Sequence, residues 1–306
     1  MIDFLSATLR IATPLAFTAL GGIVSEQAGV FAIGLEGMML AGALGAAAGS
    51  FFGNGWLVSL IDSVVCGMAV GGIVAVVALF YRADQIVTGL AANLLVLGLT
   101  GFIVRVGLGH GHAPVIHVPL LASWRVPGLA NLPVIGPVLF CQQPLTYLAA
   151  AATAALSMVL SRTRAGLLLR ASGENPHAVY AAGCSPFAIR VAAVIAGAGL
   201  AGFGGAVLVL QQVGTFTDAM TGGRGFIALA AIVVGRWRPF SAIAACLVFA
   251  AAEALNLRLQ GVDLAVSSYI VQMVPYVISL AILAGWGRTV KLPAALGVAY
   301  HKNDCP

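Results

Sequence analysis

Long apolar runs dominate this chain, and they restrict what it can fold into more than any other feature. About 20 consecutive apolar residues are enough to cross the hydrocarbon core of a bilayer. The clear candidates for crossing segments are 30–52, 56–80, 86–106, 189–212, 239–257 and 264–286. Only 8% of the residues are charged, whereas soluble domains carry about 25%. Lipid must therefore surround most of the surface, because the chain has too few charges to dissolve in water.

Three further segments are weaker candidates. Residues 4–24 are apolar but contain Arg10 and Pro14, and residues 143–160 are only just long enough to cross. Residues 225–235 are too short for an ordinary span. We expect a broken helix or half-helix there, packed inside the protein where its free backbone groups find partners. The sequence therefore predicts an all-α, polytopic bundle of about eight to ten transmembrane helices in a single domain, 1–306.

The basic residues indicate which loops face the cytoplasm. The net charge is +5, and Lys and Arg in membrane proteins concentrate in cytoplasmic loops. Residues 161–190 carry four arginines, ending with Arg190, against the single acid Glu174. We therefore expect 161–190 to be a cytoplasmic loop and 107–142 to be an extracytoplasmic loop. The basic excess then reflects topology and not a nucleic-acid partner, while the side of the N-terminus stays open.

The chain carries no cluster of reactive groups typical of an enzyme. It has no GxxxxGK[ST], HExxH or GxSxG motif, so we expect neither catalysis nor an ATP site in this chain. Its five cysteines are scattered without CxxC spacing. His110, His112 and His117 lie close together in the outer loop, and HxH spacing is compatible with a metal ion. Because no carboxylate or cysteine accompanies them, we favour ordinary loop histidines and expect no metal site.

A few polar side chains lie inside or beside the apolar spans. They include Glu36 in AIGLEGMML, Asn93 in QIVTGLAANLLVLG, and Glu253. Such groups usually face the bundle interior or a water-filled path, because burying them in lipid is costly. For Glu36 a functional role and a structural bond to a neighbouring helix both remain open, whereas a structural role is favoured for the amide of Asn93. Glu26, in the connection before the second span, is expected in a solvated interfacial position.

The loop 161–190 contains a clear helix signal. Asn175 suits the N-cap, Pro176 the first helical position, and Gly183 the end of the helix. The pattern predicts a helix of about two turns over 176–182. Such a helix suits either a lipid-surface element or a contact with a cytoplasmic partner.

Small residues recur every four positions in one span, at Ala193, Gly197, Ala201 and Gly205. Small side chains on one helix face let neighbouring backbones approach closely. The ladder therefore predicts tight helix packing and carries no information about function.

Five blocks of the sequence, in order, resemble the permease subunits of bacterial nucleoside ABC importers, within the larger group of simple-sugar and branched-chain amino acid permeases. The first block is TPLAFTALGGIVSEQAGVFAIGLEGMMLAGALGA, residues 13–46. The others are QIVTGLAANLLVLGLT, RTRAGLLLRASGENPHAVYAAG, GRGFIALAAIVVGRWRPF, and the closing PYVISLAILAG with LPAALGVAY. Together they span most of the chain except 107–142. Ala32 departs from the pattern, because the family usually has Asn there, and this puts the common substrate in doubt.

The resemblance implies a multi-pass permease of the bacterial inner membrane that works with separate partners. These are a second permease subunit, a cytoplasmic ATPase subunit that binds the ATP and Mg²⁺, and an extracytoplasmic substrate-binding lipoprotein. It implies no cofactor in this chain itself. It also implies that the helix 176–182 couples to the ATPase, through Glu174, Asn175, Pro176, Ala178, Ala181, Ala182 and Gly183.

The same resemblance implies that a nucleoside or a related small solute is the substrate. We expect Phe31, Glu36 and Asn93 to line its path. Sugars and branched-chain amino acids remain alternative substrates of an importer permease. An ion-coupled secondary transporter, with Glu36 or Glu253 as its proton site, is the alternative mechanism.

Overall fold

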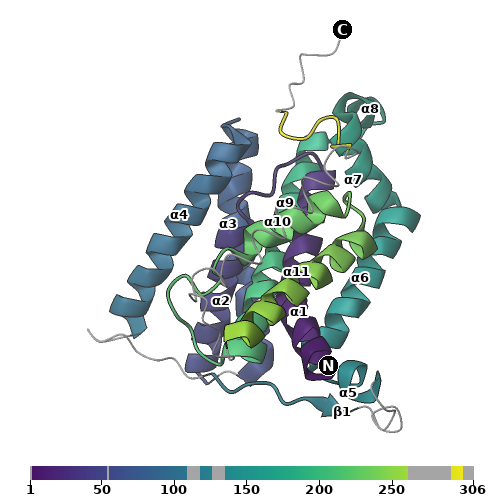
Figure 1. The fold of residues 1–306 in the computed structure, drawn as a ribbon. Helices are drawn as coiled ribbons and strands as arrows, with labels where there is room; N and C mark the ends of the chain where they lie inside the picture. Colours follow the sequence, from purple (N-terminus) through teal and green to yellow (C-terminus); the bar gives the residue numbers. More distant parts are fainter. Residues whose placement is uncertain (1, 54, 109–117, 126–134, 261–290, 299–306) are drawn as a thin grey trace.

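The computed structural model describes residues 2–53, 55–108, 118–125, 135–260 and 291–298. They form a bundle of long helices, with α8 (Pro176–Ala181) at one end and the start of α1 (Ile2–Gln27) at the other (Figure 1). We call these the α8 end and the N-terminal end. The other helices are α2 (Leu35–Phe51), α3 (Gly55–Ala75), α4 (Gln85–Ile103), α5 (Ile135–Leu139), α6 (Pro144–Arg162), α7 (Arg164–Glu174), α9 (Pro186–Val207), α10 (Arg224–Val234) and α11 (Pro239–Gln260). Wider π-helical turns extend three of them: α3 over Val76–Phe80, α4 over Val104–Leu108 and α9 over Leu208–Val213.

The predicted all-α, polytopic bundle is confirmed. Six helices in the described part of the chain are long and apolar enough to cross a membrane, namely α1, α3, α4, α6, α9 and α11. Two shorter apolar helices, α2 and α10, lie among them. The half-helix expected near 225–235 is α10. The predicted span 264–286 and the three loop histidines fall outside the described residues.

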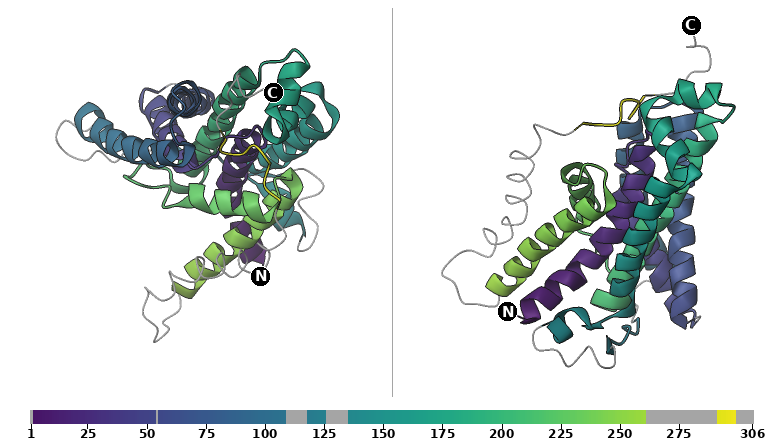
Figure 2. Two further views of the ribbon diagram at one scale, coloured as in Figure 1. Left: turned by 90° about the horizontal axis from the view of Figure 1, so that it is seen from above. Right: turned by 90° about the vertical axis from the view of Figure 1, so that its right-hand side faces the viewer.

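The first helix forms without interruption, although Arg10 and Pro14 make residues 4–24 a weak candidate for a span. α1 is continuous and most of its length is buried in the bundle, where it runs beside α11 (Figure 2). Pro14 has no N–H to donate to the carbonyl of Arg10, four residues earlier. Gln212, from the end of α9, donates its Nε2–H to that carbonyl at 2.5 Å. A side chain far away in the sequence therefore repairs the defect that makes this segment look weak.

The hydropathy of the second apolar run predicts a helix from residue 30 onward, but the structure begins this helix later. The chain leaves α1, turns at Gly29 with φ +94°, and enters α2 only at Leu35. Glycine adopts this left-handed conformation without the Cβ penalty that other residues meet. The connection 28–34 is mostly buried although it is not helical, so hydropathy alone does not distinguish it from a span.

The small-residue ladder marks the most crowded helix of the bundle, which confirms the predicted tight packing. α9 packs against α1, α2 and α3. A Cβ atom on Gly197 would collide with the backbone of Gly21 in α1, and one on Gly205 would collide with the backbone of Met39 in α2. Ala201, between them, is fully buried. Backbone-to-backbone contact of this kind fixes the three neighbouring helices at close range.

The loop predicted over 161–190 contains a second helix besides α8. The Thr163 hydroxyl donates to Val159 O at 2.7 Å at the end of α6 and accepts from Gly166 N at 3.1 Å at the start of α7. One side chain therefore ends one helix and caps the next. At the N-terminal end, β1 (Trp124–Arg125) and β2 (Cys141–Gln142) form a short antiparallel pair with Trp124 opposite Gln142.

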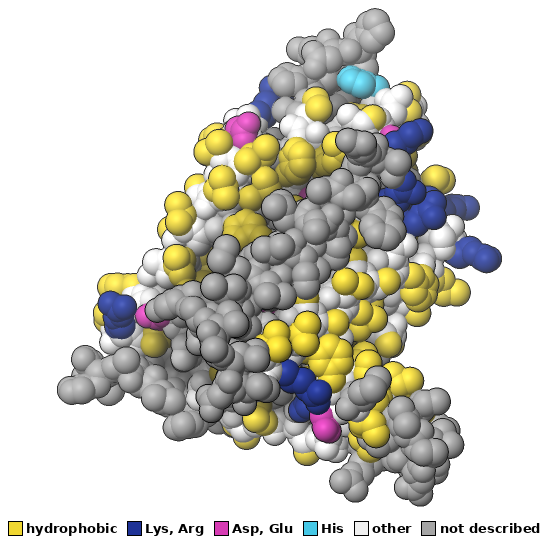
Figure 3. Space-filling model, viewed as in Figure 1, with side chains coloured by type: hydrophobic (Ala, Val, Ile, Leu, Met, Phe, Trp, Pro, Cys, Tyr) yellow, Lys and Arg dark blue, Asp and Glu magenta, His cyan; other side chains and the backbone are white. Residues whose placement is uncertain are grey.

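Charged side chains lie mainly toward the two ends of the bundle, and apolar side chains cover much of the described surface between them (Figure 3). The turn between α3 and α4 shares the α8 end, since Arg82 and Tyr180 line one groove. Arg10 and Arg258 lie at the N-terminal end, the latter 5.6 Å from the ring of Phe4. This arrangement agrees with the predicted sorting of the loops.

The expectation that Arg190 lies in a solvated loop is wrong, because this residue is 1% exposed inside the bundle.

Candidate functional site

The polar groups of the candidate site meet where the short helix α10 begins. Its N-cap residue, Gly223, has no side chain to satisfy the free amides of the first turn. Glu36, from the first turn of α2, supplies the missing acceptor. One carboxylate oxygen accepts from Thr221 Oγ1 at 2.6 Å and from Gly223 N at 2.8 Å. The other accepts from Gly225 N at 2.7 Å, so Glu36 satisfies and neutralises the electropositive start of α10.

Asn93 connects α4 to the same corner of the molecule. Its Oδ1 accepts from Gly37 N at 2.8 Å, and its Nδ2 donates to Ile33 O at 2.9 Å. The first-turn amide of Gly37 has no partner within its own helix. Glu36 and Asn93 therefore both bond the backbone at broken helix ends, which is the structural role that the sequence left open for Glu36 and favoured for Asn93.

Both side chains also line a cavity of about 390 Å³ bounded by α2, α4 and the start of α10. Small-molecule sites usually measure roughly 300–1,000 Å³ and combine apolar walls with a few convergent polar groups. Here the polar groups are those of Glu36, Asn93 and Thr221. The rest of the lining is apolar or glycine: Gly37, Leu40, Leu90, Leu94, Leu97, Ala219, Gly222, Gly223 and Phe226. The cavity thus has the character of a site for a small solute.

Glu253 stabilises α10 from the other side. Its carboxylate pairs with Arg224, the first residue of α10, at an N–O distance of 2.6 Å, and each side chain is 21% exposed. The pair joins α11 to the start of the half-helix. Among the described residues no group of three or more His, Cys, Asp or Glu side chains could hold a metal ion.

The prediction that Glu26 is solvated is wrong. The side chain is 2% exposed and accepts from Trp237 Nε1 at 2.6 Å and from Ala32 N at 3.4 Å. Trp237 has φ +55°, a left-handed conformation that is strained for a bulky residue. Gln27 Nε2 donates to the carbonyl of the same tryptophan. The end of α1 therefore holds the strained turn between α10 and α11, a contact between distant residues that no local pattern signals.

Phe31 lies outside the 390 Å³ cavity. Its ring lies against Gly297, and its amide donates to Gln85 Oε1 at 2.9 Å. Ala32, the departure from the family pattern, is 4% exposed and does not line the cavity either. The structure thus brings Glu36 and Asn93 together and places Phe31 apart from them.

The helix predicted over 176–182 is present as α8, and its cap is confirmed. Asn175 Oδ1 accepts from Ala178 N at 3.1 Å, Pro176 opens the helix, and Gly183 follows it with φ +81°. Val179 is 3% exposed and anchors α8 to the bundle. Among the residues expected to couple to the ATPase, Pro176 is half-buried. The remaining six are exposed: Glu174, Asn175, Ala178, Ala181, Ala182 and Gly183.

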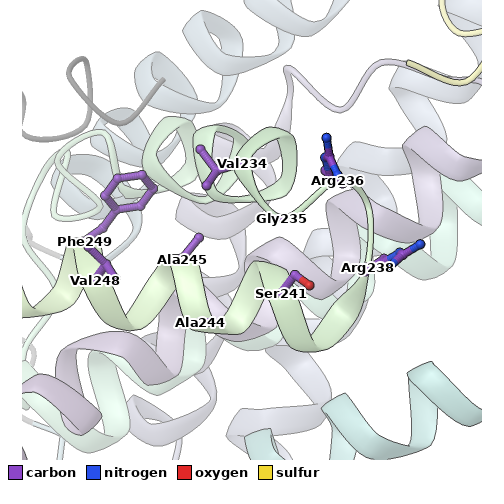
Figure 4. Close-up of a pocket in the computed structure, with 9 residues that line it drawn as sticks. All are labelled: Val234, Gly235, Arg236, Arg238, Ser241, Ala244, Ala245, Val248 and Phe249. Carbon is purple, nitrogen blue, oxygen red and sulfur yellow. The ribbon is translucent and has the colours of Figure 1, made fainter. Parts of the chain in front are cut away.

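A second and larger cavity, of about 550 Å³, lies between α10 and α11 (Figure 4). Its walls are mainly small or apolar, including Val234, Ala245 and Phe249. Figure 4 places Arg236 and Arg238 at the end of the cavity opposite Phe249. Because polar groups from several elements do not converge in it, this cavity is a weaker candidate for a solute site than the smaller one.

Comparison with known proteins places the chain among transport proteins. Residues 4–283 match the family described as "Branched-chain amino acid transport system / permease component". The chain is 37% identical to a guanosine ABC transporter permease of Bacillus subtilis, over 97% of this chain and 96% of the relative. It is 35% identical to a nucleoside ABC transporter permease of Lactococcus lactis, over 96% and 95%. A metal-chelate-type ABC transporter solved in an inward-facing conformation has a similar fold, with a TM-score of 0.52 and 11% identity over 92% of this chain and 85% of that one.

Proposed function

The chain belongs to the permease family of the branched-chain amino acid transport system, and on this premise we propose that it carries nucleosides into a bacterial cell. As an ABC transporter permease it is a transport subunit and not an enzyme. Its proposed partners are a second permease subunit, a cytoplasmic ATPase subunit and an extracytoplasmic substrate-binding lipoprotein in the inner membrane. The ATPase subunit binds the ATP and Mg²⁺. Two relatives over nearly the whole chain, named for guanosine and nucleosides, support this choice of substrate.

The observation that carries the proposal is that Glu36 already neutralises the positive end of α10. In other transporters the N-terminus of a half-helix binds an anionic group of the substrate. Here the carboxylate of Glu36 takes three donors at that position, and Arg224 is paired with Glu253. A substrate carboxylate would meet a negative group and an already occupied helix end. The cavity therefore favours a neutral solute over a branched-chain amino acid.

The walls of the cavity favour a nucleoside over a sugar. Leucines from α2 and α4, together with Phe226, give a broad apolar surface that suits the face of a base. The amide of Asn93 and the hydroxyl of Thr221 keep hydrogen-bonding capacity beyond the bonds they make, enough to meet ribose hydroxyls. In this proposal Glu36 and Asn93 line the path, and Phe31 lies outside the 390 Å³ cavity.

The contacts of the two glutamates argue against ion-coupled transport. A proton carrier needs a carboxylate that gains and loses its proton during transport. Glu36 holds the start of α10 through three donors, and Glu253 holds it through Arg224. Protonating either group would break a structural contact of the bundle.

We place the ATPase at the α8 end, which is then the cytoplasmic side. α8 exposes a capped, alanine-rich surface beside α7, which carries Arg164 and Arg170, and exposed small residues suit docking into a cleft of a partner. Closure of the ATPase on ATP would move α8 and switch the two permeases between outward and inward states.

Uptake by reconstituted vesicles tests the proposal. The chain is reconstituted with its second permease, ATPase and binding lipoprotein, and entry of radiolabelled guanosine, leucine and glucose is followed with and without ATP. We expect ATP-dependent guanosine uptake, no leucine uptake, and no transport by this chain alone. Uptake by the isolated chain under a proton gradient would instead establish the secondary transporter, and ATP-driven leucine uptake would overturn the argument from Glu36.

A further inference from the structure

A buried arginine lies near the α8 end, away from the candidate site. Arg190, in the first turns of α9, is 1% exposed. Its guanidinium donates to three backbone carbonyls: Val298 O at 2.7 Å, Ser172 O at 3.3 Å and Ala295 O at 3.4 Å. In the described part of the chain no carboxylate pairs with it, and its Nε has no acceptor. A buried cation without a counter-ion is costly, so its position needs a physical explanation.

The carbonyl oxygens provide that explanation. Ser172 lies in the last turn of α7, where carbonyls have no partner within the helix and the helix dipole is negative. The other two carbonyls come from a turn near the C-terminus. A planar guanidinium presents five donors in a fixed fork and can bridge acceptors from separate segments, whereas the lysine ammonium is a point charge. Arginine is therefore suited to join α7, α9 and the C-terminal turn at one point.

Residues 293–298, which we call the C-terminal strap, lie across two other segments. Ala295 N donates to Gly173 O at 2.8 Å, at the end of α7, and Gly297 N donates to Gly29 O at 3.2 Å, in the connection between α1 and α2. A Cβ atom on Gly29 would lie 2.9 Å from Arg190 Nη2. The strap and the arginine thus contact the same two segments.

One of these segments leads to α8. α7 ends at Glu174, and α8 begins two residues later at Pro176. A displacement of α8 therefore acts directly on the carbonyls that Arg190 and the strap bind.

The other segment leads to the cavity. The connection 28–34 runs straight into α2, which carries Glu36, and Asn93 bonds the carbonyl of Ile33. Ser172 Oγ also donates to Ala28 O at 3.3 Å. Two hydrogen bonds, joined by the backbone of the connection 28–34, therefore link the end of α7 to Asn93 in the lining of the 390 Å³ cavity.

We propose that Arg190 is a positioning residue that clamps the C-terminal strap between the α7–α8 segment and the connection 28–34, so that movement of α8 reaches the cavity. The inference rests on the proposed function, because it takes α8 as the contact with the ATPase. Losing the clamp should leave the ATPase able to turn over while fewer nucleosides enter for each ATP hydrolysed.

The test compares Arg190→Met and Arg190→Lys with Arg170→Met in the reconstituted complex. Arg170 is a matched control, because it is an exposed arginine of the same end of the bundle, on α7. Hydrogen exchange at the amides of Ala295 and Gly297 measures whether the strap is released. Guanosine uptake and ATP hydrolysis, both per assembled complex, measure the coupling.

We expect Arg190→Met to speed exchange in the strap and to lower the guanosine imported per ATP by about tenfold, the scale of one lost charged hydrogen bond. Arg190→Lys should fall between wild type and Arg190→Met, and Arg170→Met should match wild type. A purely structural role would lower the amount of assembled complex and leave the ratio per ATP unchanged, which would overturn the inference. So would unaltered exchange in the strap of Arg190→Met. If wild type itself shows no ATP-dependent guanosine uptake, the proposed function fails instead, while the exchange result still decides whether Arg190 holds the strap.

Discussion

Replacing Glu36 by glutamine tests whether this carboxylate holds the start of α10. Glutamine keeps the shape of the side chain but turns one acceptor oxygen into an N–H donor. Glu36 now accepts from Thr221 and Gly223 with one oxygen and from Gly225 with the other. Whichever way the amide is turned, at least one backbone N–H of the first turn faces another donor.

The cost follows from the bonds that change. A hydrogen bond to a charged group contributes about 1.5–3 kcal/mol, and at least one is lost outright. The charge at the helix N-terminus contributes a further 0.3–1 kcal/mol or so, and roughly 2 kcal/mol at most in a partly buried site. Glu36→Gln should therefore destabilise the protein by roughly 2–5 kcal/mol. At roughly 2 °C per kcal/mol, the midpoint of thermal unfolding in detergent should fall by about 4–10 °C.

Asp84→Asn provides the matched control. Asp84 also caps a helix, accepting from Ile86 N and Val87 N at 2.9 Å each, but it lies exposed at the start of α4. Asparagine caps a helix about as well as aspartate, so the midpoint should stay within about 1 °C of wild type. If Glu36→Gln is as stable as this control, the carboxylate does not hold α10 and our explanation of the neutralised helix end is incorrect.

Three further changes test separate contacts. Gly225→Ala should sharply reduce the yield of monodisperse protein in size-exclusion chromatography, because its Cβ would lie 2.6 Å from the α2 backbone; a normal yield would contradict the packing. Gln212→Leu should cost about 1 kcal/mol in thermal stability, and less in a Pro14→Ala background, where residue 14 regains the N–H that bonds Arg10 O; equal costs in both backgrounds would refute the repair of α1. Ala181→Glu should abolish co-purification of the ATPase without changing thermal stability, and retained co-purification would show that α8 is not the docking surface.

The features that the sequence predicts correctly depend on neighbours in the chain. The cap of α8 needs only Asn175, Pro176 and Gly183, and it has the expected geometry. The small-residue face of α9 depends on a four-residue spacing, and Gly197 and Gly205 make the predicted close contacts. In both patterns the residues that cause the observed structure lie within one turn or on one face of a helix.

The features that the sequence does not predict depend on distant partners. Glu26 is buried because Trp237 reaches it from the turn after α10. Arg190 is buried because three carbonyls from α7 and the C-terminal strap surround its guanidinium. Hydropathy reflects the cost of burying these charged side chains, but it does not show whether a partner from a distant segment offsets that cost.

The candidate site falls between these cases. Glu36 and Asn93 are polar side chains within apolar spans, and this alone marks them as candidate functional residues. The structure places both beside one cavity. It also shows a structural purpose for each side chain, because Glu36 bonds the start of α10 and Asn93 bonds the start of α2. The connection 28–34 is not recognisable as a break from its composition, because its residues are as apolar as those of α2.

Narrowing the cavity tests the central claim most directly. Leu94 and Leu95 are adjacent exposed residues of α4, but only Leu94 lines the cavity. The measurement is ATP-dependent guanosine uptake by the reconstituted complex carrying Leu94→Trp or Leu95→Trp. If the solute passes through this cavity, Leu94→Trp should slow uptake by about tenfold, roughly the effect of a misplaced or clashing contact of 1.4 kcal/mol, while Leu95→Trp stays near the wild-type rate. Equal rates for the two variants would show that nucleosides take another path.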